Sequence, residues 1–198
     1  MYNQHFDQNF LALAPSPLVP WLEEEGSLTD RLNQKTEDAK LRVIHQEWIR
    51  AGWWEKYVLH IQNCQLWQRE IIMHSHGHIC WYAKTLVEEK VFLRHHDFFK
   101  KVEQASLNQL LFREYKAQRQ NKIYGKFNHD SSEFYWVKKA LARLAEQNIE
   151  EAENKKLIQL DDAVTLWGRC SCFTIDADSS FYLIEIFLPG LLDATGCA

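Results

Sequence analysis

Two ionisable residues lie inside segments that the strand pattern predicts to be buried. Glu185 stands within FYLIEIFLP, residues 181–189, and Arg69 stands within QLWQREIIMH, residues 65–74. Alternate side chains of a strand share one face, which places each charge among large apolar neighbours. A carboxylate there has a raised pKa unless a cation or hydrogen-bond donors offset the lost hydration. Arg69 is the natural candidate partner, since an unpaired charge in a core costs about 3–5 kcal/mol.

These two charges have two interpretations. One is a buried Arg69–Glu185 salt bridge that fixes the register of the strands and has no other role. The other is a closed pocket in which the same polar pair points at a charged ligand. The two residues by themselves leave both interpretations open.

The segment HSHGHIC contains a second group of residues that could do chemistry, namely His74, His76, His78 and Cys80. Histidine and cysteine are common zinc ligands. However, Gly77 breaks the alternation of a strand, and the spacing matches no standard zinc pattern. We therefore interpret the segment as a hairpin turn with incidental histidines and expect no metal.

The elements that position these residues can be predicted from period and capping signals. Ser27 is a candidate N-cap for a short helix over Leu28–Gln34, which follows another short helix over Trp21–Glu25. β-Branched and aromatic residues predict strands at 41–49, 53–61, 65–74 and 79–87, and a closing hairpin over 166–188. The strands at 65–74 and 79–87 form a hairpin around HSHGH.

Helical periodicity is concentrated in the middle of the chain. We expect a helix at Phe98–Val102 and another after a Ser106 cap. A longer helix is expected after a cap at Ser131 or Ser132, through Val137, Leu141, Leu144 and Ala145. Strands dominate the two ends of the chain and helices lie between them. This order predicts an α+β fold on an antiparallel β-sheet.

Composition excludes several classes of protein. The 198 residues carry a net charge of −4 and are 46% hydrophobic, which suits one domain with a sizeable core. No basic stripe favours nucleic-acid binding, and no apolar run reaches the roughly 18 residues of a membrane helix. The N-terminus lacks a secretory signal, and five irregularly spaced cysteines indicate reduced thiols. We expect a cytoplasmic monomer without membrane insertion.

Four segments resemble the chorismate pyruvate-lyase family, in the same order along the chain. They are WLEEEGSLTDRL (21–32), WQREII with the following TLV (67–87), SLNQLLF (106–112) and LWGRCS with FYLIEIFLP (166–189). The resemblance implies a single chorismate lyase-like domain over 1–198. Its fold would be a single antiparallel β-sheet with helices packed on one side and an enclosed ligand pocket sealed by flaps. A helical insertion is expected at about 113–160.

The resemblance also implies which residues contact the ligand. The family's ligand-contacting positions fall on Leu28, Arg69, Leu107 and Glu185. Leucine side chains cannot hydrogen-bond, so Leu28 and Leu107 would use their backbone amides. Each follows a serine that is predicted to cap a helix, and free N–H groups at helix starts favour anions. We expect these amides to receive a ring carboxylate, with Arg69 and Glu185 at the other end of the substrate.

The implied function is a lyase that converts chorismate to 4-hydroxybenzoate and pyruvate, the first step toward ubiquinone, without a metal or other cofactor. Arg69 and Glu185 are the expected catalytic residues. Arg69 would stabilise developing negative charge, and Glu185 would donate to the departing oxygen or receive a ring proton. Two alternatives remain open. The chain could be a non-catalytic aromatic-acid-binding domain of the same fold, or a hydrolase or isomerase that acts on chorismate or a close relative.

Overall fold

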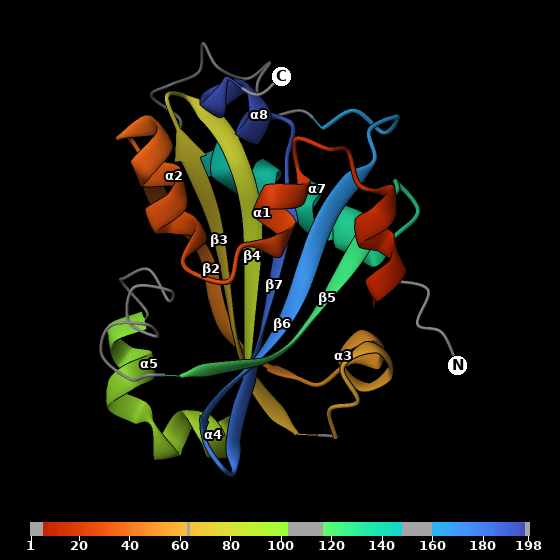
Figure 1. Ribbon diagram of the computed structural model, residues 1–198. Coiled ribbons are helices and arrows are strands. Elements are labelled where there is room, and N and C mark those ends of the chain that lie inside the picture. Colours follow the sequence, from red (N-terminus) through yellow and green to blue (C-terminus); the bar gives the residue numbers. More distant parts are fainter. Residues whose placement is uncertain (1–5, 63, 103–116, 148–159, 197–198) are drawn as a thin grey trace.

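Seven strands form one antiparallel sheet in the computed structural model, which describes residues 6–62, 64–102, 117–147 and 160–196 (Figure 1). The strand order is β1-β5-β6-β7-β4-β3-β2, and every neighbouring pair is antiparallel. The α+β class and the single antiparallel sheet are therefore confirmed. The strands are β1 (Phe6–Asp7), β2 (Lys40–Arg50), β3 (Gln65–Ser75), β4 (His78–Glu88), β5 (Gln118–Phe127), β6 (Leu166–Asp176) and β7 (Ser179–Phe187).

Helices cover both faces of this sheet, which corrects the expectation that they pack on one side. In Figure 1, α1 and α2 lie in front of the strands and α7 lies behind them. We call these two sides the α2 face and the α7 face. The helices are η1 (Gln8–Leu13), α1 (Val19–Glu23), α2 (Leu28–Thr36), α3 (Trp53–Val58), α4 (Glu89–Arg94), α5 (His96–Val102), α7 (Ser132–Gln147) and α8 (Gly190–Thr195).

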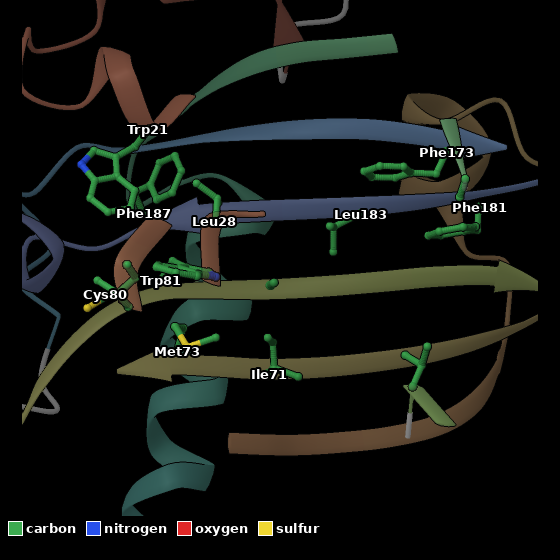
Figure 2. Close-up of a cluster of buried hydrophobic side chains, with 14 of the residues drawn as sticks. Trp21, Leu28, Ile71, Met73, Cys80, Trp81, Phe173, Phe181, Leu183 and Phe187 are labelled. Carbon is green, nitrogen blue, oxygen red and sulfur yellow. The ribbon is translucent and has the colours of Figure 1, made fainter. Parts of the chain in front are cut away.

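The strand pleat divides the core into two clusters, one on each face. Side chains of β3, β4, β6 and β7 alternate between a cluster that includes α1, α2, α4, α5 and α8, and a cluster that includes α3 and α7. On the α2 face, Trp21, Trp81 and Phe187 gather near Leu28, and Phe173 and Phe181 lie further along the strands (Figure 2). Because both faces are covered, the central strands are apolar on both sides, as their sequences predict.

Two tight hairpins set the register of the central strands. The β3–β4 turn consists of His76 and Gly77, both with positive φ (49° and 79°), which is the geometry of a type I′ turn. The β6–β7 hairpin turns after Asp176 and places Arg169 directly opposite Glu185. Both hairpins confirm predictions from the sequence.

The predicted strand at 53–61 is wrong, because Trp53–Val58 forms helix α3. The Glu55 carboxylate accepts a hydrogen bond from the Gly52 N–H at 3.0 Å, so it closes the first turn of the helix. Trp54 turns inward and its indole N–H donates to Glu133 of α7 at 2.7 Å. Burial of this aromatic ring against α7 favours the helix over the strand that the β-forming residues suggest.

A strand also lies within the segment that was expected to be a helical insertion. Residues Gln118–Phe127 form β5, which pairs with β1 and β6. The helix expected after a cap at Ser131 or Ser132 is confirmed as α7, Ser132–Gln147, and Ser131 is the residue whose hydroxyl accepts from the Phe134 N–H at 3.2 Å. The expected helix after Ser106 lies outside the described residues, as does the stretch 148–159.

The α7 face buries a network of charges. Lys84 of β4 lies 3.7 Å from Glu55 and 3.8 Å from the centre of the Trp136 ring. Glu70 of β3 accepts hydrogen bonds from Gln68 and from Arg143 of α7. Burial lowers the pKa of Lys84, and the nearby Glu55 carboxylate opposes that shift. The network thus joins α3 and α7 to the sheet through desolvated polar contacts.

We expect Lys84→Met to destabilise the fold by about 3–5 kcal/mol, because it leaves Glu55 buried without its cation. The measurement is urea unfolding followed by tryptophan fluorescence. The double variant Lys84→Met with Glu55→Gln should recover much of the loss, since no charge is then left unpaired. Equal losses in the single and double variants would contradict the ion-pair explanation.

In the part of the chain that the structure describes, no helix is both long enough and apolar enough to cross a membrane.

Candidate functional site

Arg69 lies near the middle of β3 and faces the α2 side of the sheet. Only 1% of its surface is exposed, and burial lowers the pKa of its guanidinium to about 10. Thr85 of β4 stands directly opposite, and Leu183 of β7 follows in the same row across the sheet. The predicted buried position of Arg69 is therefore confirmed.

Glu185 lies on the same face and is 1% exposed, as its strand position predicts. Its cationic partner is Arg169 of the neighbouring strand β6, whose Nε donates to Glu185 Oε2 at 2.6 Å. The expectation that Arg69 is the partner of Glu185 is therefore wrong. The reason is topological, because β4 separates β3 from β7, whereas β6 and β7 are neighbours.

Arg169 also fastens a segment of chain across the α2 face. Its Nη1 donates to the carbonyl oxygens of Trp21 and Leu22 at 3.3 Å and of Glu24 at 2.5 Å. Helix α1 supplies the first two carbonyls, and Glu24 follows α1 directly. One fully buried guanidinium thus holds both the Glu185 carboxylate and the segment that leads into α2.

The placement of Arg69 and Glu185 leaves one strand between them. Ala83 of β4 lies opposite Glu185, and Thr85 lies opposite Arg69. Neighbouring strands are about 4.8 Å apart, so β3 and β7 lie about 10 Å apart across β4. A six-membered ring over the small side chain of Ala83 would have the guanidinium on one side and the carboxylate on the other.

Leu28 is the first residue of α2, and its side chain is fully buried among Trp21, Trp81 and Phe187 (Figure 2). The predicted Ser27 cap is confirmed, since its hydroxyl accepts from the Asp30 N–H at 3.1 Å. The Leu28 N–H is at the first helical position, where no intrahelical acceptor exists. The role of its amide in ligand binding stays a prediction. Leu107 lies outside the described residues.

Three donors that the sequence did not single out lie on this face near Glu185. They are Arg169 Nη2, Ser171 Oγ and Arg119 Nη2, all buried and without a hydrogen-bond partner among the described residues. Arg169 and Ser171 lie in the sequence motif LWGRCS. The pairing of the predicted β6–β7 hairpin places Arg169 opposite Glu185 and could have identified it. Arg119 had no comparable signal, because it lies on the strand that was not predicted.

The histidines of the HSHGHIC segment make contacts around the β3–β4 turn. His76 Nε2 lies 2.8 Å from the Thr36 carbonyl, and the His76 N–H donates to Asp38 at 2.6 Å. His78 lies 3.9 Å from Asp193, and Cys80 is buried. Over residues 6–62, 64–102, 117–147 and 160–196, no three His, Cys, Asp or Glu side chains gather as metal binding requires.

A cavity of about 250 Å³ lies between α7, α8 and the start of β4, with His78, Leu141 and Asp193 in its wall. Neither Arg69 nor Glu185 borders it. The enclosed pocket expected beside these two residues stays a prediction.

Sequence comparisons give one consistent result. The profile of a family described as "Chorismate lyase" matches residues 3–196. A protein of Pasteurella multocida (strain Pm70), named "Probable chorismate pyruvate-lyase", is 26% identical over 140 residues, which cover 70% of this chain and 80% of the relative. A protein of the same name from Shewanella amazonensis (strain ATCC BAA-1098 / SB2B) is 26% identical over 181 residues, which cover 91% of this chain and 84% of the relative.

Comparison with solved structures supports the fold alone. PhnF from Mycobacterium smegmatis is similar with a TM-score of 0.53 and 13% identity, covering 84% of this chain and 65% of PhnF. The possible transcriptional regulator YydK from Bacillus subtilis subsp. subtilis str. 168 has a TM-score of 0.50 and 10% identity, covering 85% and 66%. At such low identity, these likenesses carry no function to this chain.

Proposed function

The chain belongs to the chorismate lyase family, and we propose that it removes pyruvate from chorismate to form 4-hydroxybenzoate. The observation that supports this most is the placement of Arg69 and Glu185 on one buried face, with only β4 between them. In this proposal the product would enter the route to ubiquinone, as the family resemblance implies.

The substrate supplies the driving force for this reaction. Chorismate is a cyclohexadiene with a ring carboxylate, a hydroxyl and a neighbouring enolpyruvyl ether. When the ether C–O bond breaks and C4 loses its proton, the ring becomes aromatic. The enolpyruvate gains a proton at its methylene carbon and becomes pyruvate. No atom undergoes a net redox exchange with a second reagent, so we propose that the protein works without a cofactor.

Arg69 would stabilise the negative charge that develops on the ether oxygen as the bond breaks. A guanidinium in a water-poor site is well suited to this, since its charge is preorganised and only weakly screened. Its fork of N–H groups can donate more than one hydrogen bond toward the ether oxygen. Arg69 is fully buried, which fixes its direction before the substrate arrives.

Glu185 would take the role of an acceptor. The sequence left two roles open, donation to the departing oxygen and acceptance of a ring proton. The short hydrogen bond from Arg169 Nε stabilises a carboxylate at this position. We therefore propose that Glu185 receives the C4 proton or accepts a hydrogen bond from the C4 hydroxyl, and does not act as the acid.

The ring carboxylate would lie at the opposite end, against the backbone N–H of Leu28 and, in this proposal, that of Leu107. Leu28 lies at the end of the α2 face where Trp81 and Phe187 gather (Figure 2). Apolar rings there would bind the flat face of the substrate, while the amide fixes its carboxylate.

The experiment that tests this proposal is incubation of the pure full-length protein with chorismate, with both products measured by chromatography. We expect 4-hydroxybenzoate and pyruvate in equal molar amounts, formed in proportion to the protein added. A ring product formed without pyruvate would indicate an isomerase or hydrolase. Tight binding of 4-hydroxybenzoate with no turnover would indicate the aromatic-acid-binding alternative. Either result would contradict the lyase proposal.

A further inference from the structure

Arg119 and Arg169 lie close together because both hold the segment that follows α1. Arg119 Nη1 donates to the Glu24 carbonyl at 3.0 Å and to the Glu25 carbonyl at 2.9 Å, and Arg169 Nη1 also donates to Glu24. Two guanidinium groups that share one carbonyl oxygen lie side by side. Ser171 stands two residues after Arg169 on the same face of β6.

Three cations lie close together in this region. They are Arg119, Arg169 and Lys122, and the carboxylates in ion-pair contact with them are Glu185 and Glu25. Burial, and next the proximity of Arg169, lowers the pKa of Arg119. The two guanidinium groups are therefore held near each other where water is scarce.

The donors with no acceptor point to a missing partner. Arg119 Nε and Nη2, Arg169 Nη2 and Ser171 Oγ are all buried, and within the described ranges none has a hydrogen-bond partner. Native proteins leave few buried donors unsatisfied, because each one loses its hydration without compensation. Two guanidinium edges and a hydroxyl together match a carboxylate, which offers four lone-pair positions.

We propose that Arg119, Arg169 and Ser171 form a second carboxylate subsite, which takes the carboxylate of the enolpyruvyl group. This inference rests on the proposed lyase function, in which Glu185 lies at C4 of the ring. The ether-bearing carbon is the neighbour of C4, so the enolpyruvyl carboxylate falls within a few bonds of Glu185. Ser171 lies diagonally from Glu185 across the β6–β7 ladder, within reach of that group.

The subsite has a consequence for ligand choice. Chorismate carries the enolpyruvyl carboxylate and 4-hydroxybenzoate does not. Loss of the subsite should therefore weaken the substrate and leave the aromatic product unaffected. The residues that are proposed to bind the groups common to both ligands, namely Leu28 at the ring carboxylate and Glu185 at the C4 hydroxyl, should not show this difference.

The test uses Arg119→Gln and Ser171→Ala in the full chain, with Arg143→Gln as the matched control. Like Arg119, Arg143 forms an ion pair with a glutamate, but its partner is Glu70 on the α7 face. We expect kcat/KM for chorismate to fall by about 10- to 100-fold in Arg119→Gln and by about 5- to 10-fold in Ser171→Ala. The Kd for 4-hydroxybenzoate should stay within about twofold in both, and the control should keep both values.

Two results would overturn the subsite. One is kcat/KM for chorismate within about twofold of the parent in both variants. The other is an equal weakening of chorismate and 4-hydroxybenzoate, which would indicate general damage to the site. If the parent protein does not turn over chorismate, the lyase function fails, and the subsite is judged by calorimetric Kd values for the two ligands in the same variants. Selective loss of chorismate binding would then still support it, and equal loss would reject it.

Discussion

Arg69→Ala is expected to lower kcat/KM for chorismate by about 10²–10³-fold while the chain keeps its fold. The guanidinium is 1% exposed and lies on the α2 face, where it would stabilise the charge of the departing enolpyruvate. Because the interaction is strongest when the ether bond is breaking, the loss should appear mainly in kcat. The measurement is initial pyruvate release over a range of chorismate concentrations.

A buried arginine also packs with its aliphatic stem, so the alanine variant alone does not separate chemistry from stability. Arg69→Met keeps most of the apolar volume and should be as inactive as Arg69→Ala, with an unfolding midpoint nearer that of the parent. Arg143→Gln, on the α7 face, serves as the control for loss of an arginine charge and should remain active. Turnover within about threefold of the parent in either Arg69 variant would remove Arg69 from the mechanism.

Glu185→Gln is expected to lose activity and stability together, whereas adding Arg169→Met should restore part of the stability and none of the activity. The single variant leaves the Arg169 guanidinium buried without its carboxylate, at a cost of up to about 3–5 kcal/mol. The double variant buries no unpaired charge, although the carbonyls of Trp21, Leu22 and Glu24 lose the Arg169 donor, so we expect a partial recovery of stability. Activity should not return in the double variant, because the base for the C4 proton is absent and the proposed Arg169 contact with the substrate is lost as well.

Urea unfolding and chorismate turnover, measured on the same preparations, test this expectation. If Glu185 and Arg169 only fix the register of β6 and β7, activity should follow stability and recover in the double variant. That recovery would rule out a chemical role for Glu185. Activity that stays at the level of the single variant while stability recovers would show that the loss of activity does not come from the loss of stability.

The fold and the buried charges could be predicted from the sequence because both depend on local periodicity. Strand alternation placed Arg69 and Glu185 on apolar faces without any knowledge of the strand order. Alternation does not say which strands are neighbours. Alternation alone therefore selects the wrong arginine as the partner of Glu185. The pairing within the β6–β7 hairpin identifies Arg169.

The two other errors have different physical causes. The segment that forms α3 contains good strand formers, and its helix depends on the packing of Trp54 against α7 and on the bond from Gly52 to Glu55. Strand β5 was missed because its α2-face positions include Arg119 and Lys122, so it lacks an apolar alternation. Those two cations are the reason that β5 matters for the charge of the site, and only the pairing with β6 reveals their position.

The most direct test of the central claim is a crystal structure of the full chain with 4-hydroxybenzoate bound. The ring is expected to lie over Ala83 on the α2 face, with its hydroxyl within hydrogen-bond distance of Glu185, Arg69 in contact with the ligand, and its carboxylate against the Leu28 amide. A ligand bound elsewhere, or one on this face that touches neither Arg69 nor Glu185, would contradict the assignment of these two residues to the chemistry.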